Sequence, residues 1–179
     1  MPSPIEPITL YSDRPDATRA LGRRIGAAVE PGQVIALRGD LGAGKTTLAQ
    51  GIAEGLGIAA RVTSPTFTLV AEYQSEHGLR LVHVDAYRLG DDPADAAREA
   101  ATFGLEEILA GAADDGAAGA PEGAVVLIEW AERVHTLLPD DLLLIALRHS
   151  EQDPDARTIT LTANGPRSTR LLRALMQEN

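Results

Sequence analysis

The chain has 179 residues, a formal net charge of −10 and no cysteine, and 44% of its residues are hydrophobic. This length and apolar fraction suit one domain that buries a core. The lack of cysteine excludes disulfides and thiolate metal sites, and it favours a reducing cytoplasmic setting. The acidic charge argues against a broad nucleic-acid-binding surface, because phosphate contacts need a basic patch.

The N-terminal sequence MPSPIEPITL has neither the basic nor the apolar region of a signal peptide, and we expect residues 1–7 to be disordered. No apolar run approaches the ~18 residues of a membrane span, so no membrane association is expected.

The predicted helices and strands follow one another in an order typical of an α/β fold with one core. Residues 113–123 are small, acidic and glycine-rich, and we expect a mobile surface loop there. In chain order, the predicted elements are a capped helix at 12–29, a buried strand at 33–40, a helix at 46–57, an antiparallel hairpin of strands 67–74 and 79–87, two short helices within 91–110 that break near Gly104, a strand at 123–131, strands at 141–149 and 156–163, and a helix at 167–177.

The segment GDLGAGKTT, residues 39–47, matches the phosphate-loop pattern G-x-x-x-x-G-K-[ST] and lies between a predicted strand and a predicted helix. Glycines let the backbone amides point at phosphate oxygens, and the start of the following helix adds its positive dipole. The lysine would reach the terminal phosphates, and the threonine hydroxyl would bind Mg²⁺. We therefore expect the phosphates of a nucleotide to contact Gly39, Gly42, Ala43, Gly44, Lys45, Thr46 and Thr47.

The lysine of this loop is the only lysine in the chain, since the other fifteen basic residues are arginines. A general bias of the chain's composition toward arginine explains these fifteen residues. The exception at Lys45 indicates a position where a compact ammonium fits a phosphate cradle and a planar guanidinium does not.

Two apolar runs end in carboxylates, RLVHVD at Asp85 and VVLIE at Glu129. Ligands of open α/β sheets lie beyond the carboxyl ends of the strands, so both acids are candidates for Mg²⁺ binding or for activating water. Spacing does not decide which of them binds the metal. His83 precedes Asp85 on the same strand face, and a packed or hydrogen-bonded role is expected because no second ligand stands at a usable interval.

Two further residues stand beside these candidates. Thr66, in the segment SPTF, offers a hydroxyl near the expected γ-phosphate, although an ordinary turn explains this segment as well. Trp130, the only tryptophan, follows Glu129 and could equally belong to the core.

Three kinds of nucleotide chemistry compete. A small GTPase is excluded, because its base-reading motif needs a second lysine and DAYR stands where D-x-x-G is required. A small-molecule kinase stays open, although RHSEQDPDAR, residues 148–157, makes a poor lid. A partner-driven ATPase also stays open.

The motifs GDLGAGKTT, SPTFTLV, H-x-DAYRL and IEW, in this order and spacing, resemble the bacterial TsaE (YjeE-like) family over the chain from about Thr9 to the last strand. The resemblance implies a single P-loop ATPase domain, residues 1–179, with a P-loop NTPase-type three-layer fold and a mixed, partly antiparallel sheet. It implies that Thr46 and Glu129 hold Mg²⁺ and that Asp85 supports hydrolysis.

The resemblance also places Lys45 and Thr66 in the catalytic site, Thr66 within a switch-like segment, and it places Arg157 near the nucleotide. It further implies a weak, partner-stimulated, Mg²⁺-dependent ATPase required for threonylcarbamoylation of adenosine 37 in ANN-decoding tRNAs. ATP turnover would reset a TsaB–TsaD complex, and tRNA would be held only through those partners.

Overall fold

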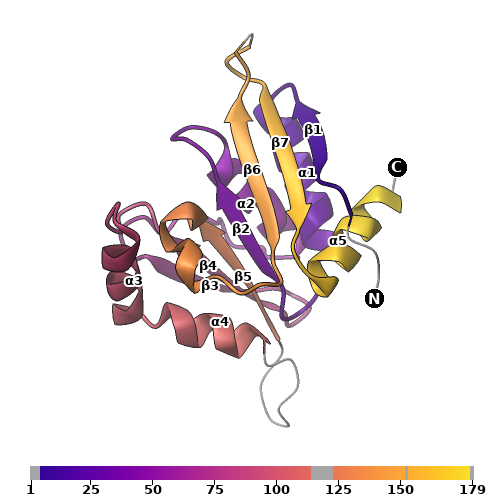
Figure 1. The fold of residues 1–179 in the computed structure, drawn as a ribbon. Coiled ribbons are helices and arrows are strands. Elements are labelled where there is room, and N and C mark those ends of the chain that lie inside the picture. The colour runs from indigo at the N-terminus through magenta and orange to yellow at the C-terminus, as the bar shows by residue number, and fades with distance from the viewer. Residues whose placement is uncertain (1–4, 114–122, 152, 178–179) are drawn as a thin grey trace.

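The computed structural model of the chain describes residues 5–113, 123–151 and 153–177. A seven-stranded sheet of order β1-β7-β6-β2-β5-β4-β3 forms its centre (Figure 1). The four central strands are mutually parallel, and antiparallel strands flank them on both sides. The strands are β1 (Ile8–Ser12), β2 (Val34–Arg38), β3 (Val70–Gln74), β4 (Arg80–Asp85), β5 (Ala124–Glu129), β6 (Leu143–His149) and β7 (Arg157–Ala163).

Helices cover both faces of this sheet, which gives the predicted three-layer α/β fold (Figure 1). One face carries α1 (Pro15–Ala28), α2 (Lys45–Gly55) and α5 (Pro166–Gln177), and the other carries α3 (Pro93–Thr102), α4 (Leu105–Ala113) and the 3₁₀ helix η1 (Ala131–Leu137). Within the described ranges, no helix has the length and apolar composition of a membrane span.

The buried side chains form two clusters, one on each face of the sheet, where the sequence predicted one core. Side chains alternate between the faces along each strand. In β4, Leu81 packs with the cluster under α1 and α2, whereas Val82 packs with the cluster under α3 and α4. The central parallel strands are buried on both faces, so apolar side chains must pack on each side of the sheet.

The N-terminal region differs from the prediction. A strand that the sequence did not predict, β1, pairs antiparallel with β7, and Ile5 packs against the adjoining core. Ser12 ends this strand and does not begin the helix, since α1 starts at Pro15. The prediction that this helix is capped by a side chain is wrong, because no side chain caps its N-terminus. The Ser12 hydroxyl instead lies 2.8 Å from the Thr18 hydroxyl.

The other differences are local. The first strand of the predicted hairpin begins at Val70, since residues 66–68 form a turn, and the 3₁₀ helix after Trp130 was not predicted. The break near Gly104 between two short helices is confirmed. Residues 1–4 of the expected disordered terminus and 114–122 of the expected mobile loop lie outside the described residues.

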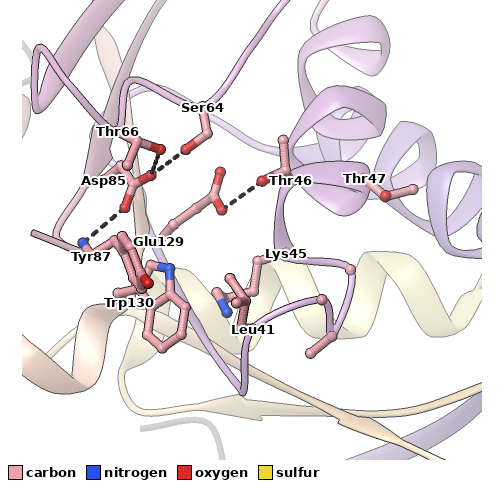
Figure 2. Close-up of a pocket in the computed structure, with 13 residues that line it drawn as sticks. Leu41, Lys45, Thr46, Thr47, Ser64, Thr66, Asp85, Tyr87, Glu129 and Trp130 are labelled. Carbon is pink, nitrogen blue, oxygen red and sulfur yellow. Dashed lines mark hydrogen bonds between the residues drawn. The ribbon is translucent and has the colours of Figure 1, made fainter.

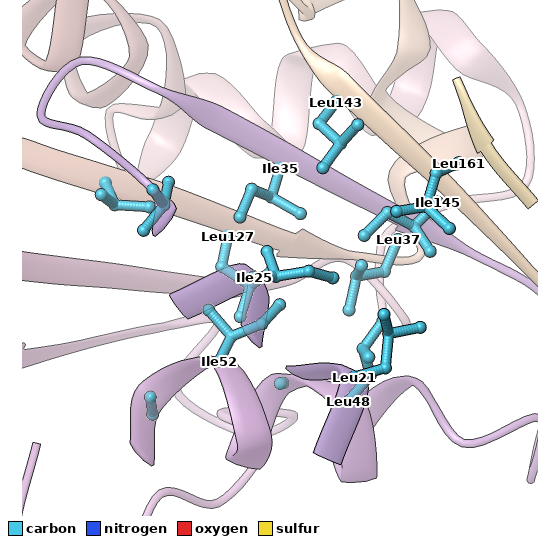
Figure 3. Packing of buried hydrophobic residues seen from close by; sticks show 14 of the residues in the cluster. Leu21, Ile25, Ile35, Leu37, Leu48, Ile52, Leu127, Leu143, Ile145 and Leu161 are labelled. Atoms are coloured by element: carbon cyan, nitrogen blue, oxygen red, sulfur yellow. The ribbon is translucent and has the colours of Figure 1, made fainter. Parts of the chain in front are cut away.

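Helices α1 and α2 pack with their backbones in direct contact. A β-carbon on any of four glycines would lie less than 3.0 Å from backbone atoms of the other helix, so no larger residue fits. These residues are Gly22 and Gly26 of α1 and Gly51 and Gly55 of α2. Ile25 and Ile52, one from each helix, fill the space between this contact and the sheet (Figure 3). The contact fixes the position of α2, whose first residue is Lys45.

We predict that Gly26→Ala lowers the free energy of unfolding by about 1–3 kcal/mol, because the added methyl group forces the two helices apart. The matched control is Gly111→Ala in α4, where a β-carbon meets nothing within 4 Å. That control is expected to be stabilised by up to about 1 kcal/mol through helix propensity. Urea unfolding of both variants measures the difference, and equal stabilities would contradict the close-packing account.

Candidate functional site

A cavity of about 350 Å³ opens at the carboxyl ends of the central parallel strands, between these ends and the start of α2 (Figure 2). The loop from β2 to α2 forms one wall, and the last residues of β4 and β5 form another. This is the edge of an open α/β sheet where ligands bind. The lining residues are Leu41, Gly42, Ala43, Gly44, Lys45, Thr46, Thr47, Ser64, Thr66, Asp85, Tyr87, Glu129 and Trp130.

The β2–α2 loop requires glycine at its two ends. Gly44, which caps α2, has φ 100°, in the left-handed region that disfavours other residues. Gly39 has φ 145°, and a β-carbon there would collide with the carbonyl oxygen of Leu147 in β6. The first and last glycines of the sequence motif therefore shape the loop that leads into α2.

The Lys45 ammonium is bound by its own loop. Its Nζ donates to the carbonyl oxygens of Gly39, at 2.5 Å, and Asp40, at 2.9 Å. It also lies 3.6 Å from the centroid of the Trp130 ring, at the distance of a cation–π contact. The lysine is 5% exposed, so these three contacts take the place of water around the charge.

Burial lowers the pKa of Lys45 below its usual value, and nearby carboxylates, of which Glu132 has the largest effect, oppose this shift. The net lowering means that the surroundings do not fully compensate the buried ammonium. An anion bound in the cavity would supply the missing compensation.

The two acids at the strand ends lie side by side, because Asp85 of β4 is in register with Glu129 of β5. Both side chains are 2% exposed. The Thr46 hydroxyl, in the first turn of α2, donates to Oε2 of Glu129 at 2.9 Å, and His83 Nε2 lies 2.9 Å from Oε1 of the same carboxylate. The predicted hydrogen-bonded role of His83 is therefore confirmed.

Asp85 has donors of its own. The hydroxyls of Ser64 and, at 2.7 Å, Thr66 donate to Oδ2, and the backbone amide of Tyr87 donates to Oδ1 at 2.9 Å (Figure 2). These bonds tie the segment SPTF to the end of β4. Thr66 thus lies in the cavity wall and contacts an acid, rather than only forming a turn.

An aromatic pair, Tyr87 and Trp130, lines the cavity beside Lys45. Trp130 adopts φ 59°, which is unusual for a bulky residue. The centroid of its ring lies 4.9 Å from the centroid of the Tyr87 ring. The guanidinium of Arg133 lies 5.7 Å from the Trp130 ring. Trp130 is thus part of the cavity as well as being packed against the core.

The structure places Arg157 beside the β2–α2 loop but not among the residues that line the cavity. From the first position of β7, its Nε donates to the carbonyl of Ala43 and its Nη2 to that of Gly42, both at 3.1 Å. Its Nη1 donates to the carbonyls of Pro154 and Ala156. The guanidinium therefore braces the loop backbone.

Nine of the predicted site residues line the cavity. The other two do not line it: Gly39 is the first residue of the β2–α2 loop, and Arg157 contacts that loop from β7. Leu41, Ser64 and Tyr87 also line the cavity, although they were not predicted to belong to the site. Ser64 and Tyr87 had a signal, since they belong to the same SPTF and DAYR segments as Thr66 and Asp85.

The donors at the cavity floor suit Mg²⁺. The hydroxyl of Thr46 and the carboxylate of Glu129 are hard oxygen ligands, and their side chains are in direct contact. Mg²⁺ commonly takes only one or two protein ligands, together with substrate phosphates and water. The described residues contain no group of three or more His, Asp or Glu side chains that could hold a metal by themselves.

The fold and this glycine-rich loop define a P-loop-type α/β protein. The profile of the family described as "Threonylcarbamoyl adenosine biosynthesis protein TsaE" matches residues 12–159. The chain belongs to the TsaE family.

Comparisons with individual proteins support this family membership. The chain is 38% identical over 165 residues to a tRNA threonylcarbamoyladenosine biosynthesis protein TsaE from Bacillus subtilis, covering 92% of this chain and 91% of the relative. It is 36% identical over 152 residues to the Streptomyces coelicolor protein of that name, covering 83% and 92%. The crystal structure of Bacillus subtilis YdiB superposes with a TM-score of 0.72 at 34% identity, covering 97% of this chain and 96% of that one.

We predict that Arg157→Gln loosens the β2–α2 loop, because hydrogen bonds from a charged donor to two loop carbonyls are lost. Amide hydrogen exchange in residues 42–45 is expected to rise by about tenfold or more, which corresponds to about 1.4 kcal/mol or more of lost local stability. Arg148→Gln, an exposed arginine on the neighbouring strand β6, is the control. Unchanged exchange in Arg157→Gln would show that the brace is dispensable.

Proposed function

We propose that the chain binds ATP with Mg²⁺ in this cavity and hydrolyses it, slowly alone and faster with protein partners. The observation that carries the proposal is the meeting of three side chains at one cavity. Lys45 and Thr46 from the start of α2 and Glu129 from the end of β5 combine a cation for phosphate with hard oxygens for a metal.

Different groups of the protein would bind the phosphates and the metal. The backbone amides of the β2–α2 loop and the dipole of α2 would bind the phosphates. Lys45 would leave the carbonyls of its own loop and the Trp130 ring to contact the terminal phosphates. When bound, Mg²⁺ would be held by Thr46 and Glu129 and would neutralise charge on the phosphates.

Asp85 is the group we assign to water. As a buried carboxylate in register with Glu129, it would orient the attacking water and accept a hydrogen bond from it. Its contacts with Ser64 and Thr66 support a site at which the SPTF segment lies beside the γ-phosphate.

Family membership supports a role for this ATPase in tRNA threonylcarbamoyladenosine biosynthesis. We propose that ATP turnover resets a TsaB–TsaD-type complex that modifies adenosine 37 of ANN-decoding tRNAs. The net charge of −10 supports partners, rather than this chain, as the holders of tRNA. A small-molecule kinase is the alternative, and the family of the relatives favours the tRNA role over it.

We predict that Glu129→Gln and Asp85→Asn each lower ATP turnover by a factor of about 10² or more, because each removes a charge from the metal or water position while keeping the side-chain volume. Turnover is measured with and without a TsaB–TsaD pair, and circular dichroism confirms that the variants fold. Near wild-type turnover in both variants would contradict the site assignment. A phosphorylated small molecule as the product would support the kinase instead.

A second prediction separates shape from charge at the only lysine. Lys45→Arg is expected to weaken ATP binding by about tenfold or more, because a broad guanidinium does not fit a cradle built for an ammonium. The reverse exchange at an exposed site beside the loop, Arg38→Lys, is the control and should leave the affinity unchanged. Calorimetric titration measures both, and wild-type affinity in Lys45→Arg would refute the argument from the single lysine.

A further inference from the structure

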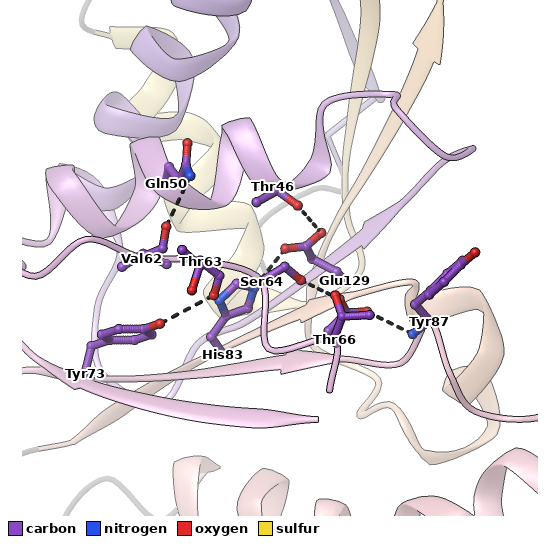
Figure 4. A network of polar contacts seen from close by, with 11 residues as sticks. Thr46, Gln50, Val62, Thr63, Ser64, Thr66, Tyr73, His83, Tyr87 and Glu129 are labelled. Atoms are coloured by element: carbon purple, nitrogen blue, oxygen red, sulfur yellow. Dashed lines mark hydrogen bonds and ion pairs between the residues drawn. The ribbon is translucent and has the colours of Figure 1, made fainter. Parts of the chain in front are cut away.

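His83 is fully buried in β4, two residues before Asp85 and on the same face of the strand. Its Nε2 lies 2.9 Å from Oε1 of Glu129, on the neighbouring strand (Figure 4). The other oxygen of that carboxylate, Oε2, accepts from Thr46. Each oxygen of Glu129 is therefore fixed by a different element of the fold, one by the sheet and one by the helix.

The second ring nitrogen of His83 shows which way the bond runs. Among the described residues, Nδ1 of His83 is the only buried side-chain nitrogen or oxygen without a hydrogen-bond partner. A hydrogen on Nδ1 would be a buried donor with nothing to bond, so the ring hydrogen belongs on Nε2. The imidazole thus donates to Glu129 and makes no other hydrogen bond.

We propose that His83 is a positioning residue for Glu129: its Nε2–H holds Oε1 so that Oε2 stays beside the Thr46 hydroxyl, where a divalent cation would bind. The inference rests on the proposed Mg²⁺-nucleotide site and adds to it the residue that sets its metal affinity. His83 does not line the cavity, so it acts through Glu129 and not as a ligand.

The energetic reason lies in the burial of the carboxylate. Glu129 is 2% exposed, so water cannot replace a lost donor at Oε1. Without His83, the carboxylate would have to rotate about its terminal torsion, which is broad, or leave one oxygen unpaired. Groups that orient a metal ligand in this way are typically worth about 10- to 100-fold in metal affinity.

Two substitutions of His83 separate positioning from packing. His83→Gln carries an amide N–H at the same number of bonds from Cβ as Nε2, whereas His83→Leu fills the space without a donor. If His83→Leu fails to fold, His83→Asn replaces it, because its amide stands at the place of Nδ1 and does not reach Glu129. Val82→Ala is the packing control, since Val82 is buried in the same strand but packs on the opposite face of the sheet.

The measurement is Mn²⁺ binding by electron paramagnetic resonance at saturating ADP, together with ADP binding in EDTA. We expect His83→Leu, or His83→Asn, to weaken Mn²⁺ binding by about 10- to 100-fold and His83→Gln to remain within about threefold of the wild type. ADP binding in EDTA should be the same in all variants. Val82→Ala should lower the melting temperature and leave Mn²⁺ affinity unchanged.

Wild-type Mn²⁺ affinity in the donor-free variant would overturn the inference, and so would equal weakening in His83→Gln and His83→Leu. Failure of the proposed function looks different, because the wild-type chain itself would then bind no ADP or would bind no Mn²⁺ with it.

Discussion

The hydrogen bond from Thr46 to Glu129 joins the two halves of the site. Thr46 belongs to the first turn of α2, and Glu129 ends β5, so the bond links the start of this helix to the edge of the sheet. The bond can form because the glycine contact with α1 fixes the position of α2. The strand register places Asp85 opposite Glu129 at the same edge. Fold and site are therefore linked through the position of one helix.

The balance of charge in the cavity supports the proposal that it binds a metal-bound nucleotide. The two buried carboxylates, Asp85 and Glu129, lie near a single ammonium, that of Lys45, and each carboxylate already accepts hydrogen bonds from other side chains. Lys45 rests on the carbonyls of its own loop and on an aromatic ring, contacts that phosphate oxygens would replace. A ligand that brings both anionic phosphate and a divalent cation would satisfy the lysine and the carboxylates together.

Features carried by local sequence could be predicted, and features made by distant segments could not. The phosphate loop has a fixed spacing, and the two acids follow apolar runs, so their place at the sheet edge followed from the sequence. By contrast, β1 is short and is defined only by pairing with β7, more than a hundred residues later. The brace from Arg157 to loop carbonyls and the stacking of Lys45 on Trp130 likewise leave no mark in spacing.

The central claim is that Thr46 and Glu129 hold a divalent cation beside phosphates bound by the β2–α2 loop. The most direct measurement is a crystal structure with ADP and Mn²⁺, in which anomalous scattering locates the metal. We predict a metal at about 2.1 Å from the Thr46 hydroxyl and bound to Glu129, with the diphosphate on the amides of residues 42–47. A metal bound to Asp85 alone, or a diphosphate away from this loop, would contradict the account.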